Sequence, residues 1–392
     1  MKLKITIPIL IITSTLMTSA QTIGLTGSLN SYSFDIYQQI KVEDENLFFS
    51  PLSTYLALMI AYEGARSETK HEFDEILHIN TPDLLDDIES YYSNLITWKD
   101  SSNFLNISNA IWIQDKYKIL STYPSNIQKY KADLRSVDFS KKNETVSEIN
   151  NWVSEKTNNL IKNIVSTNDI NEYTRLIISN AIYFIGKWAY EFDRRLTKPD
   201  DFYSISNDIL QIDFMYQTEF LKYYENDEFQ FVSIPYKGND KSFCIILPQK
   251  RYGLTKIENG LDKALLDTIF NNLEYLKVIL SIPKFKLETS YSLIEPLKNL
   301  GMKTAFNSNA DFSGITTEEP LMINRINHKA YIKIDEEKTE AAASTMVAIM
   351  MSSVQVSLTK PKIFKADHPF LFLILDNETK GIIFIGRYAI PE

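Results

Sequence analysis

The chain has 392 residues, of which 44% are hydrophobic and 23% charged, with 41 lysines and arginines against 50 aspartates and glutamates. This is the composition of an ordinary globular protein, and it excludes a disordered tail, a collagen-like fibre and a small disulfide-stapled protein. The net charge of −9 gives no overall positive field, so we expect no nucleic-acid partner.

The N-terminus differs from the rest of the chain. Lys2 and Lys4 precede a mostly apolar run over residues 5–17, and small residues follow up to Ala20. This order is typical of a secretory signal peptide, and the run is shorter than the about 20 apolar residues of a membrane-spanning helix. We therefore predict a signal peptide over residues 1–20, a mature chain over 21–392, no membrane anchor and an extracellular location.

The mature chain offers one cysteine and three glycosylation triplets. Cys244 lies in an apolar run typical of a buried strand, so we interpret it as a core residue rather than a reactive thiol. Asn106, Asn143 and Asn377 each begin an Asn-X-Ser/Thr triplet, which predicts N-glycosylation of an exported protein.

The first half of the mature chain is predicted to be mainly helical. Thr69 and Glu72 have capping-box spacing, which predicts a helix start before Phe73. Apolar spacing, or a proline suited to a first turn, predicts the other helices. These cover residues 32–40, a segment beginning at Pro51, residues 84–98 and residues 146–164.

Later segments are rich in β-branched and aromatic residues, which predicts strands over residues 176–185, 241–247, 277–287 and 323–334. Residues 370–375 and 382–385 flank a polar segment ending in glycine, which predicts a hairpin. No repeat and no linker rich in Gly, Ser or Pro divides the chain, so we expect one α+β domain.

Motifs for common chemistries are absent from the sequence. It contains no nucleophile elbow, phosphate loop, dinucleotide fingerprint or zinc-protease helix motif. His71 and His78 favour surface or packing positions over a ligand pair. We predict no enzymatic activity, metal site or cofactor, although a catalytic triad built from distant residues stays open at this point.

Residues 341–359 contain no charge, glycine or proline. Their Ser, Thr and Gln content argues against a membrane helix. A buried helix fits the spacing, and so does a strand on which Thr339, Ala341, Ala343 and alternate residues beyond form one small-to-apolar face.

Five segments occur in an order and spacing that resemble one family. They are Phe49-Ser50-Pro51-Leu52-Ser53; Asn180-Ala181-Ile182-Tyr183-Phe184 with Gly186-Lys187-Trp188; His328-Lys329-Ala330; Glu336-Glu337-Lys338-Thr339-Glu340-Ala341-Ala342-Ala343-Ser344-Thr345; and Phe364-Lys365-Ala366-Asp367-His368-Pro369-Phe370-Leu371-Phe372-Leu373. The chain resembles the serpins, a superfamily of serine protease inhibitors, over nearly its whole mature length.

The resemblance implies a serpin fold of three β-sheets and about nine helices, with an exposed reactive-centre loop over residues 336–363 that can insert into the largest sheet. In this family a protease attacks the loop and forms an acyl-enzyme, and the cut loop inserts before deacylation finishes. The implied function is a secreted suicide inhibitor of serine proteases. The alternative is a non-inhibitory carrier, chaperone or storage protein.

The loop sequence suits insertion. Residues 339–352 would span roughly 45 Å as a strand, without proline and without charge on the inward face. One residue departs from the family, because inhibitory members usually have glycine, which eases a hinge, where this chain has Lys338.

The family's usual loop length, counted from Glu336, places the scissile bond between Ser352 and Ser353, within one or two positions. Met351 or Ser352 would then be the specificity residue. Because trypsin-like enzymes require a cation there, we predict an elastase-, chymotrypsin- or subtilisin-like target.

The resemblance also places Ser53, Asn180 and His328 in a polar cluster beneath the centre of the main sheet, and Trp188 at the top, where the loop enters. Some relatives bind heparin through basic residues on the helix that matches residues 84–98. This stretch is acidic here, so we expect no heparin site, and we expect a monomer.

Overall fold

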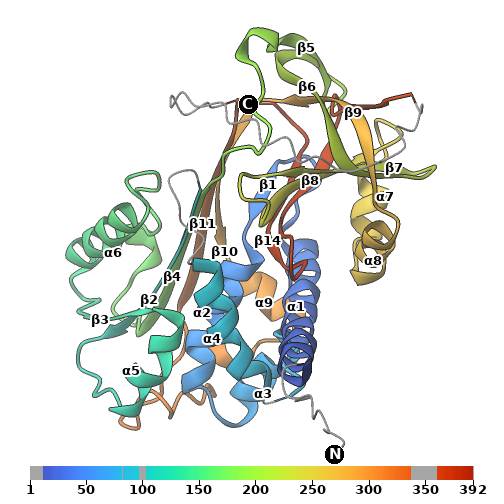
Figure 1. The fold of residues 1–392 in the computed structure, drawn as a ribbon. Helices are drawn as coiled ribbons and strands as arrows, with labels where there is room; N and C mark the ends of the chain where they lie inside the picture. The colour runs from blue at the N-terminus through green and yellow to red at the C-terminus, as the bar shows by residue number, and fades with distance from the viewer. Residues whose placement is uncertain (1–11, 82, 97–102, 337–359, 392) are drawn as a thin grey trace, which may run out of the picture.

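The computed structural model describes residues 12–81, 83–96, 103–336 and 360–391. Nine α-helices lie within them (Figure 1): α1 (Ile12–Ile40), α2 (Pro51–Gly64), α3 (Ser67–Ile76), α4 (Asp83–Ile96), α5 (Thr122–Ile127), α6 (Lys142–Lys156), α7 (Leu254–Asn259), α8 (Lys263–Asn271) and α9 (Ile294–Leu300).

The strands of these residues are β1 (Leu47–Phe49), β2 (Phe104–Gln114), β3 (Asp133–Val137), β4 (Leu176–Ile185), β5 (Lys198–Tyr203), β6 (Ile209–Glu225), β7 (Phe229–Pro235), β8 (Lys241–Pro248), β9 (Glu274–Pro283), β10 (Phe285–Ser292), β11 (Arg325–Ile334), β12 (Lys362–Lys365), β13 (Phe370–Asp376) and β14 (Ile382–Tyr388). Helices and strands mix along the chain, which confirms the α+β class.

The strands form two hydrogen-bonded sheets. The five-stranded sheet has the order β10-β11-β4-β2-β3, and the nine-stranded sheet has the order β1-β14-β13-β8-β7-β6-β9-β12, with β5 also paired to β6. Strand β6 pairs with β5 near its start and with β7 near its end, while β9 follows its other edge. Two of the three expected sheets are therefore joined into one through β6.

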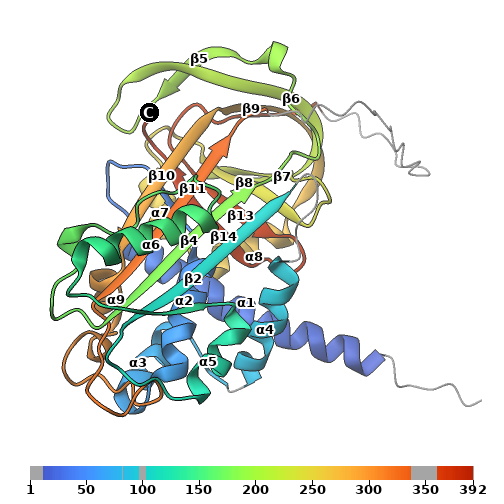
Figure 2. The same ribbon diagram turned by 90° about the vertical axis from the view of Figure 1, so that its left-hand side faces the viewer.

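Helices cover both faces of the five-stranded sheet. Figure 2 shows α6 crossing in front of β4 and β2, with α2 behind them. Trp152 of α6 packs edge-on against Trp112 of β2, with ring centroids 5.9 Å apart. Helix α2 is buried almost throughout because its sequence is apolar on every side. A sheet covered on both faces consists of strands that are buried on both faces, as the pattern of β4 shows.

Several local predictions are confirmed. Strand β4 has the predicted bounds, and β13 and β14 form the predicted antiparallel hairpin. Helix α2 begins at Pro51, with the Ser50 side chain accepting a hydrogen bond from the Ser53 backbone N–H. Cys244 is buried in β8.

The predicted capping box is wrong. Helix α3 begins at Ser67, so Thr69 lies inside it, where its hydroxyl accepts a hydrogen bond from the Asp311 N–H at 2.9 Å. The Glu72 carboxylate accepts from the N–H groups of Lys303 and Thr304, at 2.9 and 2.7 Å. Both side chains accept hydrogen bonds from backbone groups that are distant in the sequence, and the spacing of residues 69 and 72 carries no information about those groups.

Other predicted boundaries also require correction. The single strand over residues 277–287 is two strands, β9 and β10, and the helix over 146–164 ends at Lys156. Asn158 and Asn159 follow with φ of 49° and 61°, a left-handed conformation that ends a helix. Strands β2 and β3 interrupt the half that is predicted to be mainly helical.

Helix α1 crosses the predicted signal cleavage site without a break, and Figure 2 shows its N-terminal part projecting from the body of the protein. Cleavage after Ala20 stays a prediction. Among the described residues, no helix combines the length and hydropathy that crossing a membrane requires.

A buried ion pair ties α1, α7 and β14 together. The Arg387 guanidinium lies 3.2 Å from Glu258 Oε1, and both side chains are almost fully buried. The Tyr37 hydroxyl donates to the same oxygen at 2.5 Å, and burial raises the pKa of Tyr37 well above its ordinary value. The carboxylate is therefore the common partner of two buried groups.

Replacing Glu258 with alanine is expected to lower the free energy of unfolding by about 3–5 kcal/mol, because it leaves Arg387 buried without a counter-charge. The matched control is Glu228→Ala, which removes an exposed pair with Lys256 and is expected to cost at most about 1 kcal/mol. Urea unfolding followed by tryptophan fluorescence measures both, and equal losses would contradict the expectation.

Candidate functional site

The central feature of the five-stranded sheet is the boundary between β4 and β11. These strands are parallel neighbours, paired from Arg325↔Ile177 to Tyr331↔Tyr183. The ladder ends there, although both strands continue. A cavity of about 200 Å³ lies at this end, lined among others by Phe184, Gly186 and Ile334. The two strands are therefore hydrogen-bonded to each other over most of their length, and a cavity separates them at the top.

Glu336 fixes the chain where it leaves β11. Its carboxylate is buried and accepts from the Thr197 hydroxyl at 2.6 Å, and it lies 2.9 Å from the Lys284 ammonium. Burial alone would raise the pKa of Glu336, but Thr197 and Lys284 outweigh burial and hold it below the ordinary value. The carboxylate is therefore charged at neutral pH, and the last described residue before position 337 is firmly anchored.

Trp188 lies at the top of the boundary. Its indole N–H donates to the carbonyl of Asp335 at 2.8 Å, and its ring stacks on Tyr236 with centroids 4.9 Å apart. Both rings line the cavity at the end of the ladder. The open end therefore has an aromatic wall that is hydrogen-bonded to the segment leaving β11.

Halfway along the boundary, His328 of β11 and Asn180 of β4 face each other in register. His328 Nδ1 lies 2.5 Å from Asn180 Oδ1, and His328 Nε2 lies 3.2 Å from the Ser50 backbone N. Because the Ser50 N–H can only donate, Nε2 accepts and the proton belongs on Nδ1, which donates to Asn180. Burial lowers the pKa of His328 to about 3, so the ring is neutral.

Asn180 extends this contact across the sheet. Its amide nitrogen lies 2.6 Å from both Ser53 Oγ and Asn109 Oδ1. We call Ser50, Ser53, Asn109, Asn180 and His328 the latch. It connects β11, β4 and β2 to the start of helix α2, and its His328–Asn180 hydrogen bond crosses the boundary between the two parallel strands.

The structure thus brings together all three residues that the resemblance grouped, and it adds Ser50 and Asn109. Asn109 lies directly opposite Asn180 in the β2·β4 register. Only knowledge of that pairing would have identified it, because the two residues lie far apart in the sequence.

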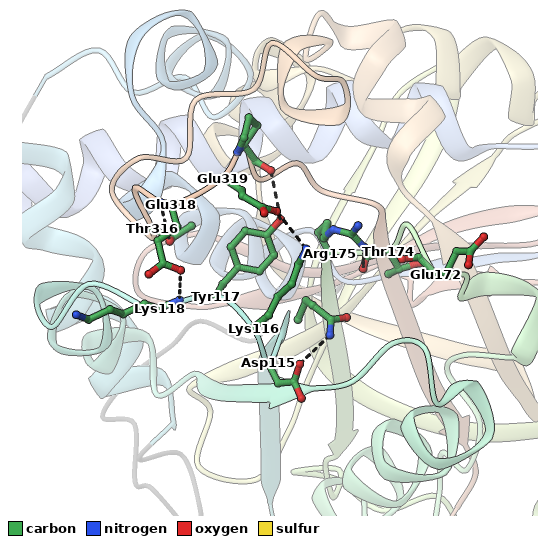
Figure 3. A network of polar contacts seen from close by, with 12 residues as sticks. Asp115, Lys116, Tyr117, Lys118, Glu172, Thr174, Arg175, Thr316, Glu318 and Glu319 are labelled. Carbon is green, nitrogen blue, oxygen red and sulfur yellow. Dashed lines mark hydrogen bonds and ion pairs between the residues drawn. The ribbon is translucent and has the colours of Figure 1, made fainter.

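The lower ends of the same strands are tied together. Asn324, just before β11, accepts through its side-chain oxygen from the Arg175 and Leu176 N–H groups at the start of β4, at 2.7 and 3.2 Å. Figure 3 shows a neighbouring contact, in which Glu319, in the segment before β11, lies 3.1 Å from the Lys116 ammonium just after β2. The boundary is therefore tied at its base, whereas its strand ladder stops short of the top.

Most of the predicted loop sites lie outside the described residues. These are the hinge residues after Glu336, from Glu337 to Thr345, the specificity residues Met351 and Ser352, and the scissile bond Ser352–Ser353. Their assignments stay predictions, and Glu336 is the one hinge residue with described contacts.

The three glycosylation triplets differ in accessibility. Asn143 is exposed in the first turn of α6. Asn106 is half-buried in β2, and its amide donates to the Lys156 carbonyl at 2.6 Å. The Asn377 amide donates to the Asn239 carbonyl at 2.7 Å. Glycosylation stays a prediction, and of the three asparagines Asn143 is the one with an exposed side chain.

The latch predicts a dependence of stability on pH. The His328 pKa of about 3 lies below the ordinary 6.5. As the pH falls below 6.5, the His328 ring binds a proton in the unfolded chain but stays neutral in the folded protein. The stability that this neutral ring contributes is therefore fully present above pH 6.5 and is lost in acid. The loss is at most about 1.4 kcal/mol per pH unit.

Urea unfolding at pH 7.5, 6.5 and 5.5 measures this loss. His328→Gln is expected to be less stable at pH 7.5 and to show a smaller decline in acid than the parent. The control is His71→Gln, because His71 is exposed beside Glu75. A parent and a His328→Gln variant with parallel pH profiles would show that this ring does not control acid stability.

Comparisons with known proteins agree with this geometry. The family model described as Serpin (serine protease inhibitor) matches residues 27–391. An uncharacterized serpin-like protein of Thermococcus kodakarensis is 38% identical over 93% of this chain and 85% of its own length. The leukocyte elastase inhibitor of Xenopus tropicalis is 35% identical over 94% of this chain and 100% of its own length.

Among solved structures, human thyroxine-binding globulin superposes with a TM-score of 0.84 at 26% identity, covering 95% of this chain and 99% of its own. The sheet order, the family match and these relatives together confirm the fold that the resemblance implies. The chain belongs to the serpin family.

Proposed function

We propose that this serpin is a secreted suicide inhibitor of serine proteases with elastase-, chymotrypsin- or subtilisin-like specificity. The observation that carries the proposal is the boundary between β4 and β11, which is closed by the latch, open at the top and adjoined by the start of the loop. The named leukocyte elastase inhibitor among its relatives supports the choice of protease class.

Insertion between β4 and β11 would change the hydrogen-bonding pattern of the sheet. A chain that leaves β11 and turns back runs antiparallel to β11, and also to β4, because these two strands are parallel. The parallel ladder is replaced by two antiparallel ladders, which are slightly more stable per residue. At about 1 kcal/mol net for each added hydrogen bond, the gain is on the order of 10 kcal/mol.

The covalent step is an acyl transfer to the protease. The hydroxyl of the protease serine adds to the Ser352 carbonyl, an ester forms, and the peptide bond to Ser353 breaks with its nitrogen leaving as the amine. Insertion moves the ester away from the top of the molecule before water can hydrolyse it. The serpin itself supplies no catalytic group to this step.

A non-inhibitory carrier or storage role is the second candidate. Lys338 favours it, because a residue less flexible than glycine slows a change of backbone conformation at the hinge. The relative named thyroxine-binding globulin indicates that this fold also serves ligand binding. The two candidates differ in whether the loop inserts after cleavage.

Thr339→Arg is expected to convert the inhibitor into a substrate, because insertion would bury an unpaired charge at a cost of several kcal/mol. Incubation with pancreatic elastase, chymotrypsin and subtilisin followed by a denaturing gel should give an SDS-stable complex for the parent and mainly cleaved serpin for the variant. Glu340→Arg is the matched control, because residue 340 belongs to the other face of the strand and should keep inhibition.

Loop cleavage is expected to stabilise the protein, because the new strand adds hydrogen bonds and buries apolar surface. Material cut in the loop by subtilisin should unfold at least 10 °C above the intact form, since a gain on the order of 10 kcal/mol is large for any domain. Differential scanning calorimetry measures the change. Equal melting temperatures, with no SDS-stable complex, would favour the non-inhibitory candidate.

A further inference from the structure

Five large side chains are exposed together on the sheet beside the loop. They are Tyr190, Phe220, Tyr275, Ile279 and Ile363, with exposed fractions between 41% and 68%. We call them the outer apolar patch. Single exposed apolar residues are ordinary, but a contiguous group of them marks an interaction surface.

The register of the strands makes the patch continuous. Ile279 of β9 lies opposite Thr218 of β6 and beside Ile363 of β12. Phe220 of β6 lies opposite Lys277, so it is a diagonal neighbour of both Ile279 and Tyr275. The Phe220 and Tyr275 rings stack with centroids 5.9 Å apart, and Tyr190 interacts with Tyr275.

The patch extends between the two ends of the loop. Tyr190 closely follows Trp188, whose indole binds the carbonyl of Asp335, next to the anchored Glu336. At the other side, Ile363 closely follows Lys360, where the described chain resumes. Strands β6 and β9 lie at the upper end of the molecule in Figure 1.

Chain length limits how far a docked protease can be from this face. The seven peptide units from Ser353 to Lys360 reach at most about 25 Å. A protease of roughly 230 residues has a radius of about 20 Å. A protease bound at the predicted scissile bond is therefore within reach of the sheet beside Lys360.

Chemistry indicates what such a surface prefers. Lys222 and Lys277 are exposed on the same face as Phe220, and Lys360 is exposed at its border, so cations outnumber Glu219, the acidic residue that interacts with Lys277 and Tyr275. Apolar side chains bordered by cations are complementary to an apolar surface bordered by carboxylates.

We propose that the outer apolar patch binds the body of the target protease outside its substrate cleft, and that it selects proteases with an apolar surface bordered by acidic residues. The inference rests on the proposed function and extends it, because it assigns part of the specificity to residues outside the loop.

The test is the double variant Phe220→Thr/Ile279→Thr, in which threonine keeps the strand propensity. Association rate constants with pancreatic elastase, chymotrypsin and subtilisin are measured together with the stoichiometry of inhibition. We expect the rate constant for the most rapidly inhibited protease to fall five- to twentyfold, with unchanged stoichiometry and melting temperature. Ile209→Thr is the control, because Ile209 is 61% exposed at the far end of β6.

Unchanged rate constants for all three proteases would overturn the patch proposal. Sedimentation that shows a dimer of the parent, lost in the double variant, would also overturn it, because the occupant would be a second copy of the chain. If the parent forms no SDS-stable complex, the proposed inhibition fails. The patch is then judged by whether the double variant slows cleavage of the loop, relative to the Ile209→Thr control.

Discussion

The structure depends on one constraint, that β4 and β11 are parallel neighbours whose shared boundary is closed at the centre by the His328–Asn180 hydrogen bond. A strand that entered between two parallel neighbours and ran in the opposite direction would be antiparallel to both of them. It would therefore replace one parallel ladder with two antiparallel ladders, which are slightly more stable per residue. The latch joins the two strands halfway along this boundary, and Glu336 anchors the segment that leaves β11.

The strength of the polar contacts differs between regions in a consistent way. Around Arg387, Glu258 and Tyr37 a charged pair is buried and shared among three elements. Across the boundary the contact joins two neutral side chains, and such a hydrogen bond contributes about 1 kcal/mol net. The region around α1, α7 and β14 thus contains a buried charged contact, whereas the boundary at which we propose insertion is bridged by a neutral one.

The sequence predicts elements whose formation depends on local pattern, such as β4, the hairpin of β13 and β14, and the start of α2. It failed where distant backbone groups decide the outcome, as at Glu72, whose carboxylate binds the N–H groups of Lys303 and Thr304. The latch also depends on contacts between residues that are distant in the sequence. Ser53, Asn180 and His328 were grouped only through the family resemblance, and Asn109 required the register of β2 on β4.

The anchoring of Glu336 bears on how Lys338 affects the hinge. Glu336 is held by Lys284, between β9 and β10, and by Thr197, just before β5. Neither partner belongs to β4 or β11, so separating those strands does not require these contacts to break. In the proposed insertion, the backbone rotation that redirects the chain into the boundary would fall on the few residues after Glu336. A lysine among them would slow the start of the proposed insertion, whereas the final hydrogen bonding would depend on residues 339–352. If the loop inserts as proposed, Lys338 would act on the rate of trapping and would leave the stability gained on cleavage unchanged.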